Sequence, residues 1–97
     1  MSFQNNYNEL LTVTQREALT LIGNAAVARS VMAYLVGGPV RDLILGCRIY
    51  DLDVCIEGDD IRKFCGFLET KFGAKIMSYS EFRTCKMILV GETIDVA

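Results

Sequence analysis

A pair of glycines between an apolar run and a helical pattern is the feature that most constrains this chain. Residues 33–36 are apolar and β-prone, which predicts a buried strand that ends at Gly37 and Gly38. Pro39 suits the first position of a helix, and residues 40–45 continue at helical, core-facing spacing. A strand, a glycine turn and a helix N-terminus together present free backbone N–H groups, which can bind an anion such as phosphate.

Two charged residues follow the glycines in the first turn of the expected helix. Arg41 can add a bidentate contact to a phosphate oxygen. Asp42 is better explained as a carboxylate that the helix dipole favours than as a ligand. Taken alone, the glycine pair is more often an ordinary turn than a phosphate site, so the prediction depends on what comes next.

Two aspartates lie at alternate positions shortly after this helix. On a strand, Asp51 and Asp53 share one face, while Leu52, Val54 and Ile56 point to the other. Neighbouring carboxylates repel each other unless a cation lies between them, and Mg²⁺ prefers a few carboxylate oxygens together with phosphates and water. The alternative is a solvated, acidic strand end. Together, the two motifs indicate a site for a nucleoside triphosphate with magnesium.

The segment LVGGPVRDLILG, followed by DLDV, resembles the head domain of class II nucleotidyltransferases. This family comprises the tRNA CCA-adding enzymes and the bacterial poly(A) polymerases, and its pattern is GG-x-VRD-x-LLG followed by D-x-D. The resemblance covers residues 33–97. It implies that Gly38 and Arg41, with Gly37 beside them, fix the triphosphate of the incoming nucleotide.

The same resemblance implies the metal ligands. Asp51 and Asp53 would bind the catalytic metals, and the segment GETIDVA is similar to the one that carries the family's third carboxylate, which places it at Asp95. Glu92 is a rival for this role, but three residues along a strand reverse the direction of a side chain, so we prefer Asp95. The chain departs from the family at Cys47 and Tyr50, where basic residues are common, and this leaves substrate detail open.

The implied activity is template-independent transfer of CMP or AMP to the 3′ end of a tRNA, by CCA addition or poly(A) synthesis. Two Mg²⁺ ions would activate the RNA 3′-hydroxyl and neutralise the leaving pyrophosphate of ATP or CTP. The family's later motifs and its tRNA-binding helical domains do not occur in these 97 residues. We therefore expect a head-domain fragment that binds Mg–NTP weakly and is inactive alone. The alternatives are a regulatory NTP-binding module without transfer activity and a small structural or interaction domain.

Composition excludes several other classes. There is no histidine, and the four cysteines show no C-x-x-C spacing, which argues against zinc sites and against a Cys–His nucleophile. A net charge of −2 without a basic stripe argues against RNA tracking by this segment alone. No apolar run spans a membrane and no secretion signal is recognisable, so we expect a cytoplasmic protein with reduced thiols, Cys55 and Cys65 serving as core filler. The apolar content of 52% predicts an exposed docking face that favours self-association.

The remaining pattern predicts the elements of an α/β (α+β) fold. Thr14 is a plausible N-cap, with Glu17 completing a capping box, for a helix that runs to about Arg29 and buries Leu19, Ile22 and Ala26, with Val27 as a further candidate. Asp59 and Asp60 open a second helix through Phe72, and Gly73 ends it. Strands are expected at 75–79, 84–90 and 93–96, the last two joined in a hairpin at Gly91 and Glu92. The sum is one head domain over residues 1–97, with residues 1–31 forming an N-terminal segment and helix that pack on it. Its core would be a nucleotidyltransferase palm-like mixed sheet of about five strands with helices on one face.

Overall fold

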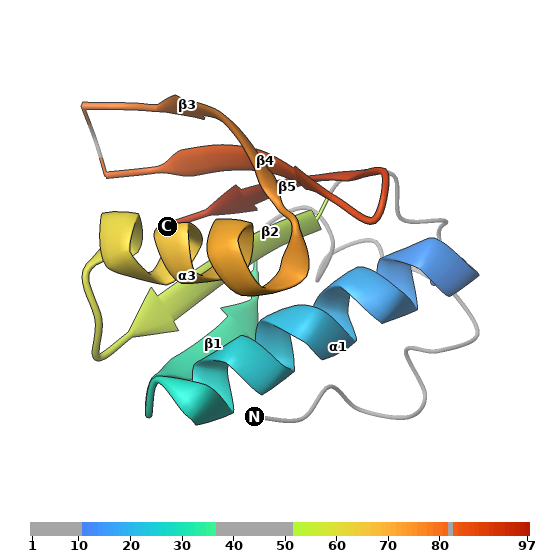
Figure 1. Ribbon diagram of the computed structural model, residues 1–97, viewed down its shortest axis with the longest axis horizontal. Coiled ribbons are helices and arrows are strands. Elements are labelled where there is room, and N and C mark those ends of the chain that lie inside the picture. The colour runs from blue at the N-terminus through green and yellow to red at the C-terminus, as the bar shows by residue number, and fades with distance from the viewer. Residues whose placement is uncertain (1–10, 37–51, 82) are drawn as a thin grey trace.

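Two helices and five strands make up the part of the chain that the structure describes, which is residues 11–36, 52–81 and 83–97 (Figure 1). This structure is a computed structural model. In chain order the elements are α1 (Val13–Ala28), β1 (Met32–Leu35), β2 (Leu52–Glu57), α3 (Ile61–Phe72), β3 (Lys75–Tyr79), β4 (Cys85–Leu89) and β5 (Glu92–Val96). The short helix expected over residues 40–45 lies outside the described residues.

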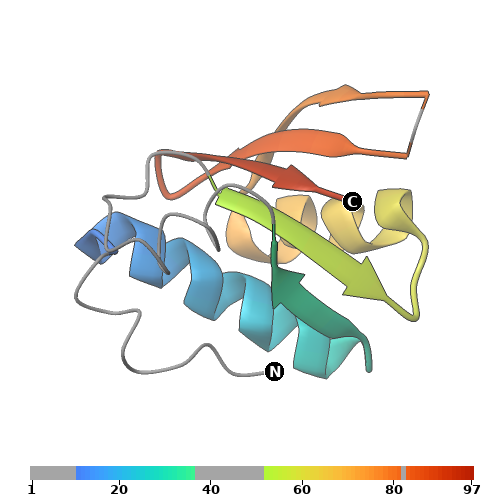
Figure 2. The same ribbon diagram turned by 180° about the vertical axis from the view of Figure 1, so that it is seen from behind.

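The strands form one mixed sheet in the order β1-β2-β5-β4-β3. β2 and β5 pair in parallel, whereas the other three pairs are antiparallel. Figure 2 shows β2 and β5 side by side with their arrowheads pointing the same way. The predicted mixed sheet of about five strands is therefore confirmed. The central position belongs to β5, the last strand along the chain.

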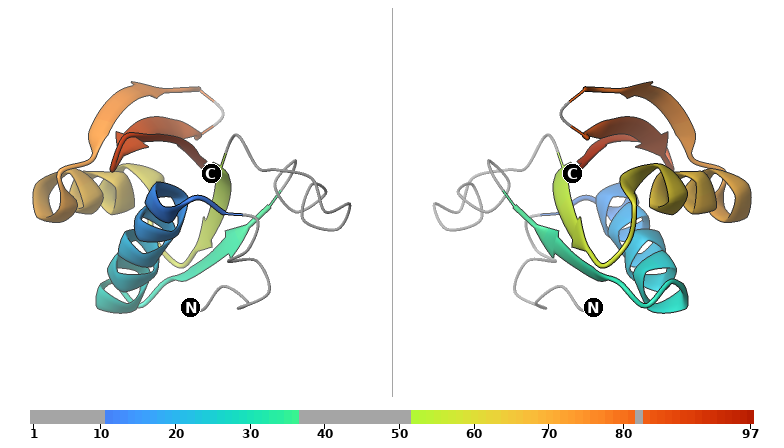
Figure 3. Two further views of the ribbon diagram at one scale, coloured as in Figure 1. Left: turned by 90° about the vertical axis from the view of Figure 1, so that its right-hand side faces the viewer. Right: turned by 90° about the vertical axis from the view of Figure 1, so that its left-hand side faces the viewer.

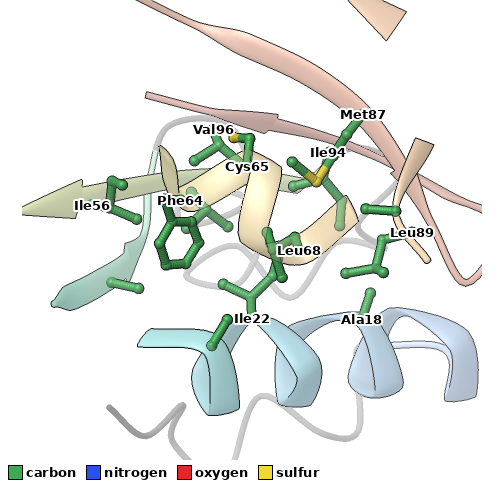
Figure 4. Packing of buried hydrophobic residues seen from close by; sticks show 14 of the residues in the cluster. Ala18, Ile22, Ile56, Phe64, Cys65, Leu68, Met87, Leu89, Ile94 and Val96 are labelled. Atoms are coloured by element: carbon green, nitrogen blue, oxygen red, sulfur yellow. The ribbon is translucent and has the colours of Figure 1, made fainter. Parts of the chain in front are cut away.

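Both helices cover the same face of this sheet, as predicted (Figure 3). We call the covered side the helix face and the other side the open face. Along β2 and β5 the alternation of burial agrees with this, because the apolar side chains on the helix face are buried and the side chains between them are half-buried. Figure 4 shows α1, α3 and the helix face meeting in one apolar core. Its largest fully buried members are Phe64, Ile22, Leu52, Leu68, Met87, Leu89, Ile94, Val54 and Val96.

The start of α1 differs from the prediction. The N-cap is Thr12, whose hydroxyl accepts a hydrogen bond from the N–H of Gln15, while the Gln15 side chain accepts one from the N–H of Thr12. The prediction of Thr14 was wrong because Thr-x-x-Gln two residues earlier forms the capping box equally well. Shielded by this box, Gln15 is only 2% exposed.

The buried stripe of α1 was predicted with one error. Leu19, Ile22 and Ala26 are buried, as expected, but Val27 is 67% exposed. Val27 lies about 100° around the helix from Ala26, and this turn carries its side chain away from the sheet. Small side chains, Ala18 and Ala25, complete the stripe instead and let the helix approach closely.

The second helix, α3, has the predicted ends. Asp60 is its N-cap and accepts hydrogen bonds from the N–H groups of Arg62 and Lys63. Gly73 ends it in the left-handed conformation, at φ 73°, where glycine is favoured because it has no Cβ. In the chain, α3 connects β2 to β3 and packs on the helix face. These two strands point in the same direction but are not neighbours, because β5 and β4 lie between them in the sheet.

The β4–β5 hairpin turns one residue earlier than predicted. Leu89 pairs with Glu92, so the two residues of the turn are Val90 and Gly91, and Glu92 already belongs to β5. Both turn residues have positive φ, 54° and 77°, which is the geometry of a type I′ turn.

Candidate active site

Two of the predicted metal ligands lie in adjacent strands at the centre of the sheet. Asp53 is on β2 and Asp95 is on β5, and the parallel register pairs them directly. The other predicted site residues, Gly37, Gly38, Arg41 and Asp51, lie outside the described residues. The structure thus brings together two predicted carboxylates that are far apart in sequence.

The pairing places both carboxylates on the open face. Their neighbours in the strands, Val54 and Ile94 among them, are buried on the helix face, so alternation directs Asp53 and Asp95 the other way. Neighbouring strands lie about 4.8 Å apart, so the Cα atoms of Asp53 and Asp95 are separated by about this distance. Both residues are half-buried, so their carboxylates lie at a surface that solvent and ions reach.

This pair fits a divalent cation by its chemistry. Carboxylate oxygens are the ligands that Mg²⁺ takes from proteins, usually one or two of them together with substrate phosphates. Within the described ranges, no group of three or more His, Cys, Asp or Glu side chains is suited to hold a metal ion. The remaining predicted ligand, Asp51, lies outside those ranges, so the described part supplies two of the three predicted ligands.

The end of the first described segment, Val36, also contacts one of these aspartates. The N–H of Val36, just after β1, donates a hydrogen bond of 2.9 Å to the backbone carbonyl of Asp53. Val36 is the last described residue before the glycine pair. The last described residue before the glycine pair is therefore held against the backbone of Asp53.

Glu92, the rival for the third carboxylate, lies on the helix face. It shares that face with Ile94 and Val96 and accepts a hydrogen bond of 2.5 Å from the hydroxyl of Thr14. This contact joins the start of β5 to the first turn of α1. Glu92 and Asp95 thus point to opposite faces, as the spacing predicted.

Sequence reasoning missed Lys86. It lies on β4, is paired directly with Asp95, and forms an ion pair with it in which the Lys86 Nζ is 4.0 Å from the Asp95 Oδ1. The alternation of β4 and a correctly placed hairpin turn would have found it. A turn at Gly91 and Glu92 would instead have put Ile88 opposite Asp95.

Two of the three described cysteines are buried thiols. Cys65 and Cys85 are fully buried, and burial raises the pKa of each thiol above its ordinary value. A raised pKa keeps the thiol protonated and unreactive. The prediction that Cys65 fills the core is confirmed. The same prediction for Cys55 was wrong, because Cys55 is half-buried on the open face, where it pairs with Tyr34.

Neither helix in the described ranges is long and apolar enough to cross a membrane.

Comparison with known proteins gives the family of this chain. A family model described as the poly A polymerase head domain matches residues 33–97. The A-adding tRNA nucleotidyltransferase of Geobacter sulfurreducens is 35% identical over 77 residues, which cover 78% of this chain and 9% of that protein. The A-adding tRNA nucleotidyltransferase of Halalkalibacterium halodurans is 32% identical over 81 residues, covering 84% and 19%.

Solved structures show the same fold. A CCA-adding enzyme in complex with ATP superposes with a TM-score of 0.82 at 27% identity, over 97% of this chain and 23% of that one. The Thermotoga maritima CCA-adding enzyme in complex with tRNA gives a TM-score of 0.81 at 28% identity, over 95% and 22%.

The sheet, its carboxylate pair and these matches define the class as a nucleotidyltransferase head domain. This chain belongs to the poly A polymerase head domain family. It spans 9% and 19% of the length of the two curated relatives described above.

Proposed function

We propose that this chain is the catalytic head of a metal-dependent nucleotidyltransferase that adds CMP or AMP to the 3′ end of tRNA, acting in the cytoplasm. The observation that carries the proposal is the parallel pairing of Asp53 with Asp95 on the open face. Two carboxylates directly opposite each other in a sheet repel, and a cation bound between them removes this repulsion. Their presence is understandable if they serve a metal.

In this proposal Asp53 and Asp95, together with Asp51, hold Mg²⁺. The ions supply activation of the RNA 3′-hydroxyl and neutralisation of the leaving pyrophosphate. Gly37, Gly38 and Arg41 bind the phosphates of the incoming nucleotide. The rigid sheet contributes position, since β2 and β5 keep the two carboxylates at a fixed spacing throughout the reaction.

The relatives support the choice of substrates. Solved structures of similar fold are complexes of CCA-adding enzymes with ATP, with CTP and with tRNA. We propose the same nucleotides for this chain, and a tRNA 3′ end as the acceptor. Because the chain covers about a fifth of those structures, we propose that the tRNA is held by other domains of a longer protein.

The role of Asp53 can be tested by substitution in the longer protein. Asp53→Asn is expected to lower nucleotide addition by at least about 10²- to 10³-fold, the scale on which removal of a charge-stabilising group slows catalysis. Its melting temperature without metal is the control for folding, since loss of activity in a folded variant points to the carboxylate itself. Radiolabelled nucleotide incorporation and thermal unfolding measure the two effects.

Glu57→Gln provides the matched control, because Glu57 lies on the same strand and the same face but is exposed beyond the carboxylate pair. This variant should retain full activity. Wild-type activity in Asp53→Asn would remove the assignment.

The 97-residue chain alone can be tested separately. We expect a small, magnesium-dependent rise of its melting temperature with ATP or CTP, and no incorporation into a tRNA that lacks its 3′ end. Incorporation by the isolated chain would contradict its proposed dependence on other domains. Absence of any thermal effect of Mg–NTP would favour a structural or interaction domain.

A further inference from the structure

Lys86, Asp95 and Asp53 form a row across three adjacent strands of the open face. Lys86 is paired with Asp95 in the antiparallel β4–β5 ladder, and Asp95 is paired with Asp53 in the parallel β5–β2 ladder. We call these three side chains the charge row. The Lys86 Nζ lies 4.0 Å from the Asp95 Oδ1, and the two side chains are 49% and 35% exposed. The row is therefore accessible from solvent.

The order of charges along the row has a direct electrostatic consequence. Two carboxylates side by side repel each other, and the ammonium group of Lys86 at one end offsets part of that repulsion. In the absence of a metal, Lys86 thus helps the sheet to keep Asp95 beside Asp53. When a divalent cation is bound between the carboxylates, Lys86 becomes unfavourable, because the two positive charges repel each other.

We propose that Lys86 is a positioning residue of the active site, an internal counter-ion that holds Asp95 and with which a divalent cation must compete. The inference rests on the proposed function, since it requires the carboxylate pair to bind such a cation. A lysine suits this role because its ammonium is a compact charge on a flexible stem and can turn away without moving the backbone. Lys86 would thereby lower the metal affinity of the empty head domain.

Metal affinity is the quantity to measure, with Mn²⁺ as the probe and the free Mn²⁺ signal in electron paramagnetic resonance as the readout. Lys86→Met keeps most of the aliphatic stem and removes the charge. We expect it to bind Mn²⁺ about three- to tenfold more tightly than the wild type at low ionic strength, because the repulsion between the Lys86 ammonium and the nearby metal ion is removed. The difference should shrink as KCl is added, because salt screens exposed charges.

Three further variants separate charge from structure. Lys86→Gln should behave like Lys86→Met, and Lys86→Arg, which keeps the charge, should bind Mn²⁺ like the wild type. Lys71→Met, with the same change of net charge on α3 at the other side of the sheet, should also bind like the wild type. Circular dichroism establishes that each variant is folded.

The outcomes distinguish this inference from the proposed function. Tighter Mn²⁺ binding by both neutral variants, together with wild-type affinity in Lys86→Arg, supports the role of Lys86. Unchanged or weaker binding in folded Lys86→Met and Lys86→Gln overturns it, even if Asp53→Asn abolishes Mn²⁺ binding and so upholds the metal site. No Mn²⁺ binding by the wild type would overturn both.

Discussion

Val90 is the one β-branched residue with positive φ in the described part of the chain. Its φ of 54° lies in the left-handed region, which a β-branched side chain rarely adopts. The following glycine has φ 77° at no such cost, so the type I′ turn is ideal at its second position only. Arg83 and Ser30 also have positive φ, but they are not β-branched. Relief of strain is therefore expected to be largest at Val90.

Replacing Val90 with Asn should stabilise the protein. Asn followed by Gly is the preferred pair for a type I′ turn, and we expect the free energy of unfolding to rise by about 1 kcal/mol. Urea denaturation measures this change. Val90→Ala is the matched control: it also removes the branched side chain but lacks the local hydrogen bonding that lets Asn adopt positive φ. An equal gain from Ala would mean that the branch, and not the turn type, limits stability.

The same turn shows what a sequence can and cannot predict about single contacts. Alternation along β5 was sufficient to place Asp95 on the opposite face from Glu92. It was not sufficient to find Lys86, because a hairpin placed one residue late pairs each β5 residue with a wrong partner on β4. Val90 caused the error, since β-branched residues are favoured in strands and not in type I′ turns.

At the scale of elements, one ion pair ties the two helices together. Arg29, the C-cap of α1, contacts Asp59, in the loop before α3, through its Nε and through a second hydrogen bond of 3.3 Å from Nη2 to Oδ1. The Arg29 guanidinium also lies 5.7 Å from the centre of the Phe67 ring on α3. The hydrogen bond from Arg29 holds the pKa of Asp59 below its ordinary value.

This lowered pKa predicts how stability depends on pH. A carboxylate whose pKa is lower in the folded state contributes stability above its unfolded pKa of about 3.9, and the contribution is lost as the pH falls through the folded value. Asp59→Asn should therefore be less stable than the wild type at pH 7, and the difference should narrow below about pH 4. Urea unfolding across this pH range measures it.

The Asn substitution is selective, because an amide oxygen can still accept the hydrogen bond that the Asp60 N–H donates to Asp59. Glu69→Gln, on the exposed side of α3, is the control and should follow the wild-type pH profile. A constant difference between Asp59→Asn and the wild type down to pH 2 would show that the ion pair is not its cause.

Most elements could be predicted because several local causes agree. α3 combines an N-cap aspartate, an apolar stripe and a terminal glycine, and its ends were predicted correctly. α1 offers two competing caps, Thr12 and Thr14, and in the structure the hydroxyl of Thr14 is bound instead to Glu92, a residue distant in sequence. Local pattern contains no information about such a contact.

At the scale of the whole molecule, β1 forms one edge of the sheet and carries apolar side chains on the open face. Met32 and Tyr34 are 51% and 40% exposed, and Val36 follows them at the same spacing. An edge strand with exposed apolar residues readily pairs with another chain. This strand is the best place for the self-association that the apolar composition predicts.

We expect the isolated chain to self-associate in a concentration-dependent manner, and Met32→Lys with Tyr34→Lys to suppress it, because lysine on an edge strand opposes pairing. Sedimentation velocity over a range of concentrations measures this. Val27→Lys removes an even more exposed apolar side chain from α1 and should leave association unchanged. A wild-type chain that stays monomeric at every concentration would contradict the expectation.

The central place of β5 has a consequence for the order in which the protein is built. During synthesis the β1–β2 pair and the β3–β4 pair both leave the ribosome before β5 does, and the sheet order separates these two pairs until β5 inserts between them. Such long-range pairing is slow, because the ends of a long loop must meet before any contact forms. Asp53 and Asp95 therefore come together only when β5 pairs with β2. Under the proposed function, a chain in which β5 has not yet joined β2 lacks the Asp53–Asp95 pair, so we expect metal binding to follow completion of the sheet.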